Sequence, residues 1–409
     1  MPHRTTPRFS RRALLPLVMA AAIAWSTKTP AQDTRSAFAR WVAAFRARAH
    51  ARGISDATYM KVMTNLQPDT SVYDLDRQQP EFNEVLWQYL NRRVSDWRIT
   101  TGKQVAKQYA PLFDRIEKDY GVERGTMLGL WGIESAFGDP LVQKNHMRPV
   151  IPALAALAFG EPRRKKYWEQ ELLNALLIID RGWSTPEEMR GSWAGAMGHT
   201  QWMPEVWLNM GVDYDNDGRV SPFGKPDDAI AGTAQYLVER GKYRAGEHWG
   251  YEVRAKGTRE GASRSYEAWA KAGVARADGQ PFAQPKATAK LWIPVPGGPA
   301  FLLGQNFYAV RSYNPSMSYA LAIVHCGDRI MGGGPFVQSF PGGERTPTLA
   351  EVKEIQERLT ALGFDTGGAD GRAGTGTMIA ARDFQRKIGM EPADGYAGVK
   401  LLARLRQGS

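Results

Sequence analysis

Cysteine is nearly absent from this chain, since Cys326 is the single one among its 409 residues. An intramolecular disulfide is therefore excluded, and the fold must be stabilised by a large apolar core. The hydrophobic content of 43% and the length are sufficient for such a core and leave room for two or three domains. We expect Cys326 to pack in that core as a small apolar residue.

Metal-binding histidine spacings and phosphate-binding loops are also missing. None of the six histidines has ligand spacing, and none neighbours a serine or cysteine in a nucleophile pattern. The glycine-rich stretch "GGADGRAGTG" lacks the GK[ST] ending and a preceding strand. These absences argue against a zinc hydrolase, a nucleophilic triad and a nucleotide-binding fold.

Negative charge is in deficit, because the formal net charge is +11, yet no long basic block is present. A scattered positive charge of this kind suits an acidic partner. Nucleic acid, an anionic membrane surface and a carboxylate-bearing cell-wall polymer all fit this description.

The first thirty residues narrow that choice. A basic segment precedes an apolar stretch over residues 13–25, and small residues follow near Ala31, which predicts an export signal over residues 1–31. The apolar stretch is shorter than the ~20 residues that a membrane span needs. No cysteine lies near the exit, so a lipid anchor there is excluded. We therefore expect an exported, soluble periplasmic protein without a stable membrane anchor.

The rest of the chain predicts a mainly α, α+β protein. Helical periodicity covers residues 36–98, with Pro80 in a first turn, and continues in helices at roughly 100–120, 125–137, 152–158, 166–181 and 226–240. Four short segments, "YEVRAKG", "LWIPVPG", "AFLLG" and "NFYAVRSYN", predict the strands of a small sheet. The stretch "SYALAIVHCGDRIMGG" predicts a further helix.

A linker and a second domain are predicted after this helix. Residues 332–348 are rich in Gly, Pro and Ser, and a domain boundary is expected near residue 345. Three amphipathic segments follow, which predict a three-helix module of some sixty residues.

Glu134 is the first candidate functional residue. It lies in "GLWGIESAFG", and on a helix its neighbours are Leu130, Trp131, Phe137 and Gly138. Desolvation by these apolar groups is expected to raise the pKa of the carboxyl group and make it a proton donor. The alternatives are a buried structural glutamate that is hydrogen-bonded to the backbone, and a glutamate that points outward from a half-exposed helix.

A second stretch, "RGSWAGAMGHTQWMPEVW" over residues 190–207, has the composition of a carbohydrate cleft. Its small residues let a ligand approach the backbone, while Trp193, Gln201 and Trp202 offer the stacking faces and amide groups that sugars need. A structural turn rich in Gly and Trp is the alternative. His199 in this stretch is expected to be either a substrate contact or a spectator.

The loop "DYDNDGRVSPFG" spaces Asp213, Asp215 and Asp217 like the first three ligands of a calcium loop, with Gly218 at the sharp turn. Its twelfth position is Gly224, where a helix-loop-helix calcium site has a bidentate glutamate. The alternative is an aspartate turn that caps itself.

Four motifs together resemble the B family of lytic murein transglycosylases. They are "LWGIESAFG", "GSWAGAMGHTQWMP", "DDAIAGTAQYL" and "YNPSMSYALAI", and the resemblance spans roughly residues 35–335. The end of the chain resembles the peptidoglycan-binding module common on cell-wall enzymes, although Ala373 stands where relatives often carry a bulkier residue. The resulting domains are a catalytic domain over 32–336, a linker over 337–347 and the module over 348–407.

The resemblance implies a lysozyme-like domain that cleaves the bond between N-acetylmuramic acid and N-acetylglucosamine without adding water. Glu134 matches the catalytic glutamate, which acts first as acid and then as base on the C6 hydroxyl of the muramic acid, giving a 1,6-anhydro end. No cofactor is implied for catalysis. A structural calcium ion is implied in the aspartate loop, with Asp228 as a further ligand.

Several residues carry over to the sugar cleft that the resemblance implies. The positions that match its lining are Ser192, Gln201, Tyr236, Tyr313, Asn314, Ser316 and Tyr319. Arg163 and Arg164 match a basic pair that could meet stem-peptide carboxylates, or they are a solvated helix start. The expected partner is peptidoglycan rather than nucleic acid, and the expected state is a monomer.

Two other functions stay open at this point. A hydrolase on the same fold would use Asp139 or another acid to activate water. A murein-binding scaffold would have no catalytic residue.

Overall fold

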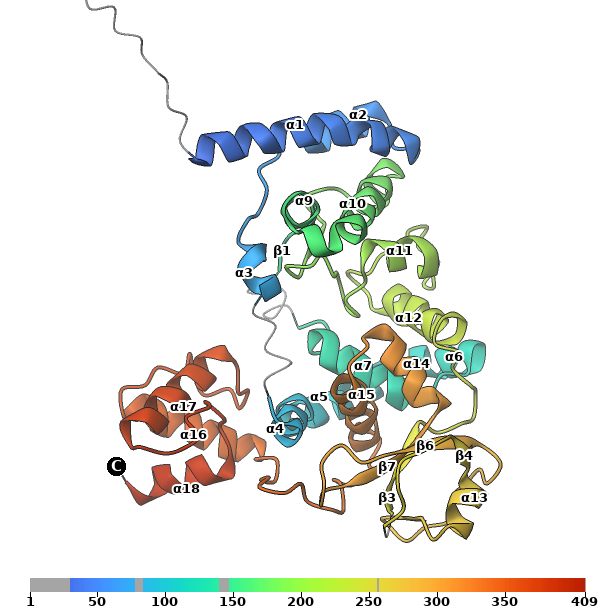
Figure 1. Ribbon diagram of the computed structural model, residues 1–409, viewed down its shortest axis with the longest axis vertical. Helices are drawn as coiled ribbons and strands as arrows, with labels where there is room; N and C mark the ends of the chain where they lie inside the picture. Colours follow the sequence, from blue (N-terminus) through green and yellow to red (C-terminus); the bar gives the residue numbers. More distant parts are fainter. Residues whose placement is uncertain (1–29, 78–83, 140–146, 256, 409) are drawn as a thin grey trace, which may run out of the picture. The chain divides into compact units, whose positions relative to one another are not determined.

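The computed structural model of the protein describes residues 30–77, 84–139, 147–255 and 257–408 (Figure 1). The predicted export signal and Pro80 lie outside these ranges, except that residues 30 and 31 begin helix α1 (Pro30–Ala51). The chain divides into two compact units, residues 1–45 and 46–409. In the first unit, the Trp41 ring of α1 stacks on Phe38 and Phe45, with centroids 5.5 and 4.9 Å apart.

The first part of the second unit is helical, as its periodicity predicts. Its elements are α2 (Asp56–Met63), α3 (Val72–Arg77), α4 (Leu86–Arg93), α5 (Asp96–Gln108), α6 (Ala110–Tyr120), α7 (Arg124–Ser135), α9 (Val150–Gly160), the 3₁₀ helix η2 (Pro162–Arg164), α10 (Lys165–Asp180), α11 (Pro204–Met210) and α12 (Asp227–Glu239). Among the described helices, none combines the length and apolarity needed to cross a membrane.

The single helix predicted over 100–120 is wrong, because it is two helices, α5 and α6. The break is at Tyr109, whose φ and ψ of −106° and 24° are not helical, and Pro111 stands in the first turn of α6. Proline has no N–H to donate to a preceding turn, so it favours the start of a new helix over the continuation of an old one.

Helices α7 and α15 (Met317–Ile330) cross closely and antiparallel at the centre of the largest core (Figure 1). Glycines make this crossing possible. A Cβ atom on Gly129 would lie 2.1 Å from the Ile323 carbonyl oxygen, and one on Gly327 would lie 2.2 Å from the Gly125 carbonyl oxygen. Only residues without a side chain let the two backbones approach this closely.

The predicted small sheet is present, with five antiparallel strands in the order β4-β6-β7-β3-β5. Their bounds are β3 (Gly250–Arg254), β4 (Arg264–Ser265), β5 (Ala275–Arg276), β6 (Thr288–Trp292) and β7 (Ala300–Gly304), and the helix α13 (Tyr266–Lys271) follows β4. In the central pairs, Tyr251 lies opposite Leu302 and Leu291 lies opposite the same residue. Val253, Trp269 and Leu302 are buried in a core that belongs to this insertion.

The strand predicted for "NFYAVRSYN" is wrong, because these residues form helix α14 (Gln305–Tyr313). Asn306, Phe307, Ala309 and Val310 are its buried residues, at helical rather than alternating spacing. The aromatic and β-branched composition of the segment suggested a strand, but burial against the core favours a helix.

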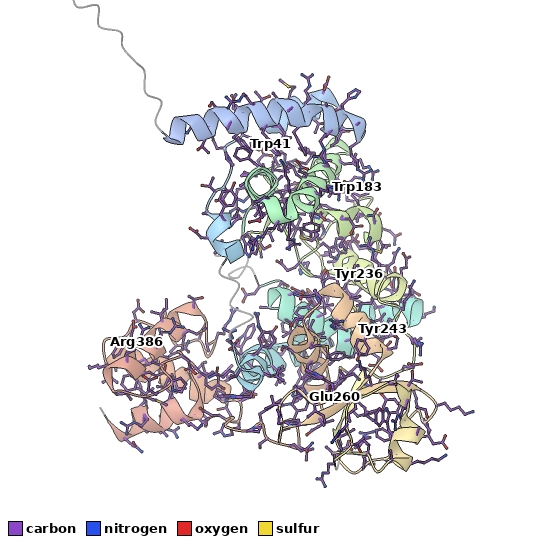
Figure 2. All side chains as sticks on the ribbon, in the orientation of Figure 1. Trp41, Trp183, Tyr236, Tyr243, Glu260 and Arg386 are labelled. Carbon is purple, nitrogen blue, oxygen red and sulfur yellow. The ribbon has the colours of Figure 1, made fainter. Side chains whose placement is uncertain are left out.

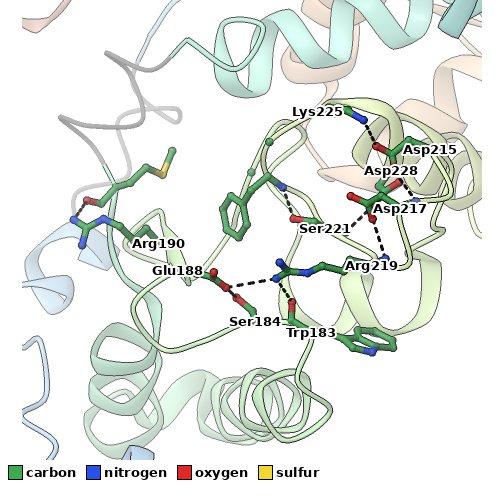
Figure 3. Close-up of a pocket in the computed structure, with 14 residues that line it drawn as sticks. Trp183, Ser184, Glu188, Arg190, Asp215, Asp217, Arg219, Ser221, Lys225 and Asp228 are labelled. Carbon is green, nitrogen blue, oxygen red and sulfur yellow. Dashed lines mark hydrogen bonds and ion pairs between the residues drawn. The ribbon is translucent and has the colours of Figure 1, made fainter.

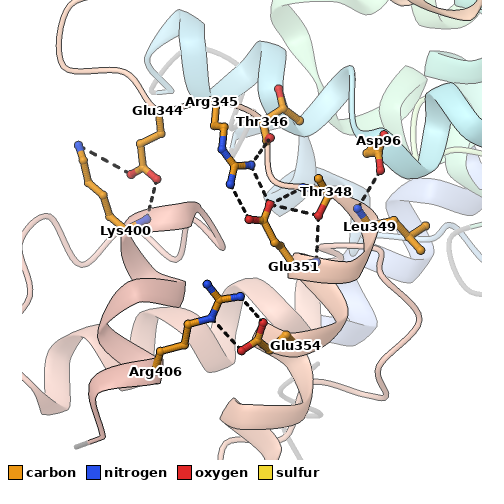
Figure 4. A network of polar contacts seen from close by, with 10 residues as sticks. All are labelled: Asp96, Glu344, Arg345, Thr346, Thr348, Leu349, Glu351, Glu354, Lys400 and Arg406. Atoms are coloured by element: carbon orange, nitrogen blue, oxygen red, sulfur yellow. Dashed lines mark hydrogen bonds and ion pairs between the residues drawn. The ribbon is translucent and has the colours of Figure 1, made fainter.

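Residues 332–348 form no helix or strand, as their composition predicts. The three predicted helices of the module follow as α16 (Leu349–Ala361), α17 (Thr375–Lys387) and α18 (Val399–Gln407), and Ile355, Phe384 and Leu401 are in their shared core. A capping box begins α16, where Thr348 Oγ1 accepts the Glu351 N–H at 3.2 Å and Glu351 Oε2 accepts the Thr348 N–H at 2.8 Å (Figure 4).

Candidate active site

Glu134 lies in the last turn of α7, where this helix crosses the start of α15. The Tyr319 hydroxyl donates a hydrogen bond to Glu134 Oε1. Directly after α7, Ala136 and Phe137 take left-handed φ values of 52° and 63°, which are uncommon for residues other than glycine. This turn brings the Phe137 ring edge-on to Trp131, with centroids 5.9 Å apart, so aromatic groups surround the end of the helix.

Two tyrosines interact with the carboxylate, and a third packs against one of them. Burial and the nearby Glu134 charge raise the pKa of Tyr319 and of Tyr313 well above the usual value, so both remain neutral hydroxyl donors. Tyr313 donates to the Thr200 carbonyl oxygen at 2.7 Å. The ring of Tyr236, labelled in Figure 2, packs edge-on against Tyr313 at 5.0 Å.

Asn314 and Ser316 form the turn between α14 and α15. Asn314 Oδ1 accepts the Ser316 N–H at 3.3 Å, and Ser316 Oγ accepts the Tyr319 N–H at 3.2 Å as the N-cap of α15. The two side chains therefore fix the start of the helix that carries Tyr319 to Glu134.

The stretch 190–207 folds back on itself between the short strand β2 (Arg190–Gly191), which pairs with β1 (Arg148–Pro149), and α11. Ser192 Oγ accepts the N–H groups of Ala194 and Ala196 at 3.3 and 3.1 Å. Gln201 has a φ of 57°, and its Nε2 donates to the Gly198 carbonyl oxygen at 3.0 Å. Both predicted cleft residues thus hold the shape of this segment.

His199 is buried, and both of its ring nitrogens contact protein groups. Trp131 Nε1 donates to His199 Nδ1 at 3.2 Å, so the proton is on Nε2, which lies 2.8 Å from the Gly224 carbonyl oxygen. Burial lowers the pKa of the imidazole and keeps it neutral. Of the two roles considered for His199, a substrate contact and a spectator, this arrangement favours the spectator.

Arg163 and Arg164 lie on η2, before α10. Arg163 is largely exposed and its Nε lies 3.1 Å from Glu161 Oε1. The Arg164 guanidinium packs over the rings of Tyr167 and Trp168, at 4.5 and 4.6 Å from their centroids. The Trp168 ring in turn lies 6.4 Å from Trp193, which links the basic pair to the 190–207 stretch.

The sequence did not single out Ser135 and Thr200, although both hold the site together. Ser135 Oγ donates to the His199 carbonyl oxygen at 2.6 Å, and the Thr200 carbonyl oxygen accepts the Tyr313 hydroxyl. Each lies within a motif next to a candidate residue. Their position in these motifs was the only sign in the sequence that they matter. Neither residue suggests a role unless its hydrogen-bond partner, His199 or Tyr313, is known.

Asp215 and Asp217 of the aspartate loop line a cavity of about 630 Å³, together with Asp228 (Figure 3). Single oxygen atoms of Asp213, Asp215 and Asp217 lie within 4.8 Å of one another, and Gly218 has the positive φ of 88° that the sharp turn requires. These hard oxygen donors fit a calcium ion. Asp228, the other expected ligand, instead accepts the N–H groups of Tyr214 and Ser221 at 2.8 and 2.9 Å.

Asp139, the acid considered for a hydrolase, forms an ion pair with the C-terminal module. Its Oδ2 lies 2.6 Å from Arg372 Nη1. A general base must be able to contact the water that it activates. Because this carboxylate is paired with an arginine, the arrangement does not favour Asp139 as the base of a hydrolase.

The chain matches two family models. The model for the transglycosylase SLT domain covers residues 37–328, and a model for a peptidoglycan binding domain covers residues 348–405. The chain is also similar to membrane-bound lytic murein transglycosylase B of Escherichia coli strain K12, with 28% identity over 277 residues, which are 66% of this chain and 73% of that protein.

Two solved structures are similar along most of the chain. SltB3 from Pseudomonas aeruginosa, in complex with NAG-anhNAM-pentapeptide, is 37% identical with a TM-score of 0.69, and the match covers 90% of this chain and 99% of that one. The Escherichia coli lytic transglycosylase Slt35, in complex with calcium, is 27% identical with a TM-score of 0.60, covering 72% and 92%. The predicted fold class, a lysozyme-like domain with a helical peptidoglycan-binding module, is confirmed.

Proposed function

The chain belongs to the family of the transglycosylase SLT domain and is a lytic transglycosylase with a peptidoglycan-binding domain, and on this premise we propose that Glu134 is its single general acid and base. The observation that carries the proposal is the Tyr319 hydroxyl on Glu134 Oε1 at the glycine-lined crossing of α7 and α15. One oxygen is oriented by this bond, and the other is the one that exchanges the proton.

The reaction needs two proton transfers and no water. In the first, Glu134 gives its proton to the glycosidic oxygen as the bond from C1 of N-acetylmuramic acid breaks. In the second, the carboxylate takes the proton of the C6 hydroxyl as that oxygen bonds to C1. The internal hydroxyl replaces the water for which other glycosidases keep a second carboxylate, so one carboxylate is sufficient.

The proposed sugar cleft extends from this carboxylate along the predicted cleft residues. Tyr313 and Tyr236 form an aromatic wall, supported by their edge-on contact at 5.0 Å. Ser192, Gln201, Asn314 and Ser316 act through the backbone shape that their side chains hold, because each makes a local hydrogen bond. Arg163 and Arg164 receive stem-peptide carboxylates at the far end of the stretch, a role that suits the exposure of Arg163.

The aspartate loop is proposed to hold a structural calcium ion through Asp213, Asp215 and Asp217. Their convergence supports the site, and the complex of Slt35 with calcium is a precedent in a relative. Asp228 supports the loop from inside by accepting two of its N–H groups rather than acting as the closing ligand. No cofactor is proposed for catalysis.

We further propose an exported periplasmic enzyme that acts as a monomer without a membrane anchor. In this proposal the catalytic domain covers residues 32–336. A linker over 337–347 follows it, and the module covers 348–407. The scattered positive charge of the chain suits the carboxylates of peptidoglycan.

Mass analysis of digested sacculi tests the reaction. A transglycosylase leaves 1,6-anhydro ends, which are lighter by one water than the reducing ends of a hydrolase. Exclusively reducing ends would replace this proposal by the hydrolase, and intact sacculi would replace it by the non-catalytic scaffold.

A further inference from the structure

A cavity of about 530 Å³ lies where α4 and α5 meet the loops of the C-terminal module. One wall comes from residues 84–98 and the other from the 346–352, 371–382 and 394–397 segments. It is separate from the aspartate-loop cavity and from the residues assigned to the sugar cleft.

Hydrogen bonds between the two sides hold the cavity in shape. Asp96 Oδ2 accepts the Leu349 N–H at 2.9 Å at the start of α16 (Figure 4). Asn91 Nδ2 donates to the Glu344 carbonyl oxygen at 2.8 Å and lies 3.0 Å from the Tyr396 hydroxyl. The cavity is therefore a pocket between the catalytic domain and the module, and hydrogen bonds fix the position of its walls.

Positive charge predominates in its lining. Five arginines line the cavity, Arg92, Arg93, Arg98, Arg372 and Arg382, against the three carboxylates Glu84, Asp96 and Asp394. Part of this charge is already paired, since Glu84 pairs with Arg92, and Arg372 pairs with Asp139, which is outside the lining. The other two carboxylates accept backbone N–H groups: Asp96 that of Leu349, and Asp394 Oδ1 that of Tyr396 at 2.9 Å.

Arg98 is held in this lining by backbone oxygens. Its guanidinium donates to the carbonyl oxygens of Gly132 at 2.8 Å and Arg93 at 2.5 Å. Burial, together with the positive charges of Arg93 and Arg372, lowers its pKa to about 10. Carbonyl dipoles offset a buried cation less than a carboxylate does, so an anion entering the cavity is favoured.

Aromatic surface complements the charge. The Arg372 guanidinium stacks over the Trp97 ring at 4.2 Å, and Tyr396 forms another part of the wall. Stacking fixes the plane of this guanidinium, whose Nη1 contacts Asp139 Oδ2 at 2.6 Å, so a further carboxylate would meet a preorganised cation. Phosphate would meet the same cation, but peptidoglycan, the polymer that this family of modules binds, carries its anionic groups as carboxylates on stem peptides.

We propose that this cavity is a second binding site, composed of the catalytic domain and the module together, for a carboxylate-bearing stem peptide of peptidoglycan. The inference rests on the proposed function for the identity of the polymer. Arg372 also pairs with Asp139, five residues beyond Glu134 in the chain. A peptide held here thus anchors its strand to the same part of the protein that carries the proposed acid.

The test is calorimetric titration of the full chain with free tetrapeptide released from peptidoglycan by an amidase. Arg372→Gln and Arg382→Gln are each expected to weaken binding at least tenfold. The matched control is Arg386→Gln, on the same helix as Arg382, with an exposed side chain outside the cavity lining. The same peptide with amidated carboxylates is expected to bind at least tenfold more weakly to the wild-type chain.

Equal binding by wild type and both arginine variants, or equal binding of the amidated peptide, would overturn the site, as would displacement of the peptide by millimolar inorganic phosphate. Thermal unfolding of each variant identifies any loss of fold. Arg372→Gln also removes the ion pair with Asp139, which could disturb the contact between the domain and the module. In that case Arg382→Gln, which leaves this pair intact, still tests the site. Sacculus digestion by the wild type is run in parallel. Peptide binding without digestion counts against the proposed function alone, and digestion without peptide binding counts against the cavity alone.

Discussion

The end of α7 and the aspartate loop hold carboxylates in opposite ways. At α7 a single carboxylate, Glu134, lies among aromatic groups with one tyrosine hydroxyl on it. In the loop three partly exposed carboxylates converge, and backbone N–H groups satisfy Asp213 and Asp217. An isolated carboxylate in an apolar setting can exchange a proton, whereas crowded carboxylates are stabilised by a cation.

Replacing Glu134 tests the proton-transfer half of this comparison and has the largest expected effect. Glu134→Gln keeps the shape and removes the acid, so we expect sacculus digestion to fall about 10³-fold. The melting temperature is expected to stay within about 2 °C. Glu357→Gln, on the exposed face of α16, is the control and should digest normally. Activity of Glu134→Gln close to wild type would assign the chemistry to another acid.

The crossing that brings α15 to Glu134 can be broken through its backbone. A methyl group at Gly129 meets the Ile323 carbonyl oxygen at 2.1 Å, a distance that requires the helices to separate. We expect Gly129→Ala to reduce the free energy of unfolding by about 3 kcal/mol and to reduce activity further than that loss of folded protein explains. Denaturant unfolding measures the first effect.

Gly261→Ala is the control, because a Cβ atom there has no described neighbour within 4 Å. Equal stability of the two variants would mean that the helices do not depend on a glycine at position 129.

Glu171 is a third arrangement, a carboxylate buried in α10 whose Oε2 accepts the Glu205 N–H at 3.0 Å. Burial raises its pKa from 4.5 to about 7. The folded protein therefore binds this proton more tightly than the unfolded chain, and the wild type loses stability as the pH rises from about 4.5 to 7.

Glu171→Gln removes that loss. Its stability relative to wild type should increase by about 3 kcal/mol between pH 4.5 and pH 8, from urea unfolding at both values. Glu357→Gln should show no such change. A pH-independent difference for Glu171→Gln would indicate that this carboxylate is ionised when folded.

Tyr319→Phe alters the setting of Glu134 without removing the acid. Losing one hydrogen bond to the ionised form favours the protonated form, so the alkaline limb of the pH–rate profile should move to higher pH, with about tenfold lower activity at the optimum. Tyr308→Phe, on α14, is the control for a lost tyrosine hydroxyl. An unshifted profile for Tyr319→Phe would limit this tyrosine to packing.

Adding calcium tests the aspartate loop, the second region of the comparison, and has the smallest expected effect. Millimolar calcium is expected to raise the melting temperature of the wild type by a few degrees, because an ion that binds only the folded loop stabilises it. Asp217→Asn should abolish most of that rise, while Asp365→Asn, in a turn of the module, should keep it. A rise that persists in Asp217→Asn would place the cation elsewhere.

The sequence by itself determined the fold class, the two domains and the motif that contains Glu134, because these depend on local periodicity, composition and motif residues. It failed at α14, where burial against the core outweighed a strand-like composition. It also joined α5 and α6, because a helical pattern spans the break at Tyr109.

Tertiary structure alone decided what Glu134 touches. Tyr319 is 185 residues away in the chain and reaches the carboxylate because glycines on α7 and α15 let the backbones cross closely. The arginine-lined cavity likewise joins residues 84–98 to segments of the C-terminal module about 250 residues or more further along the chain. Such contacts depend on the packing of distant segments, which no local pattern of residues encodes.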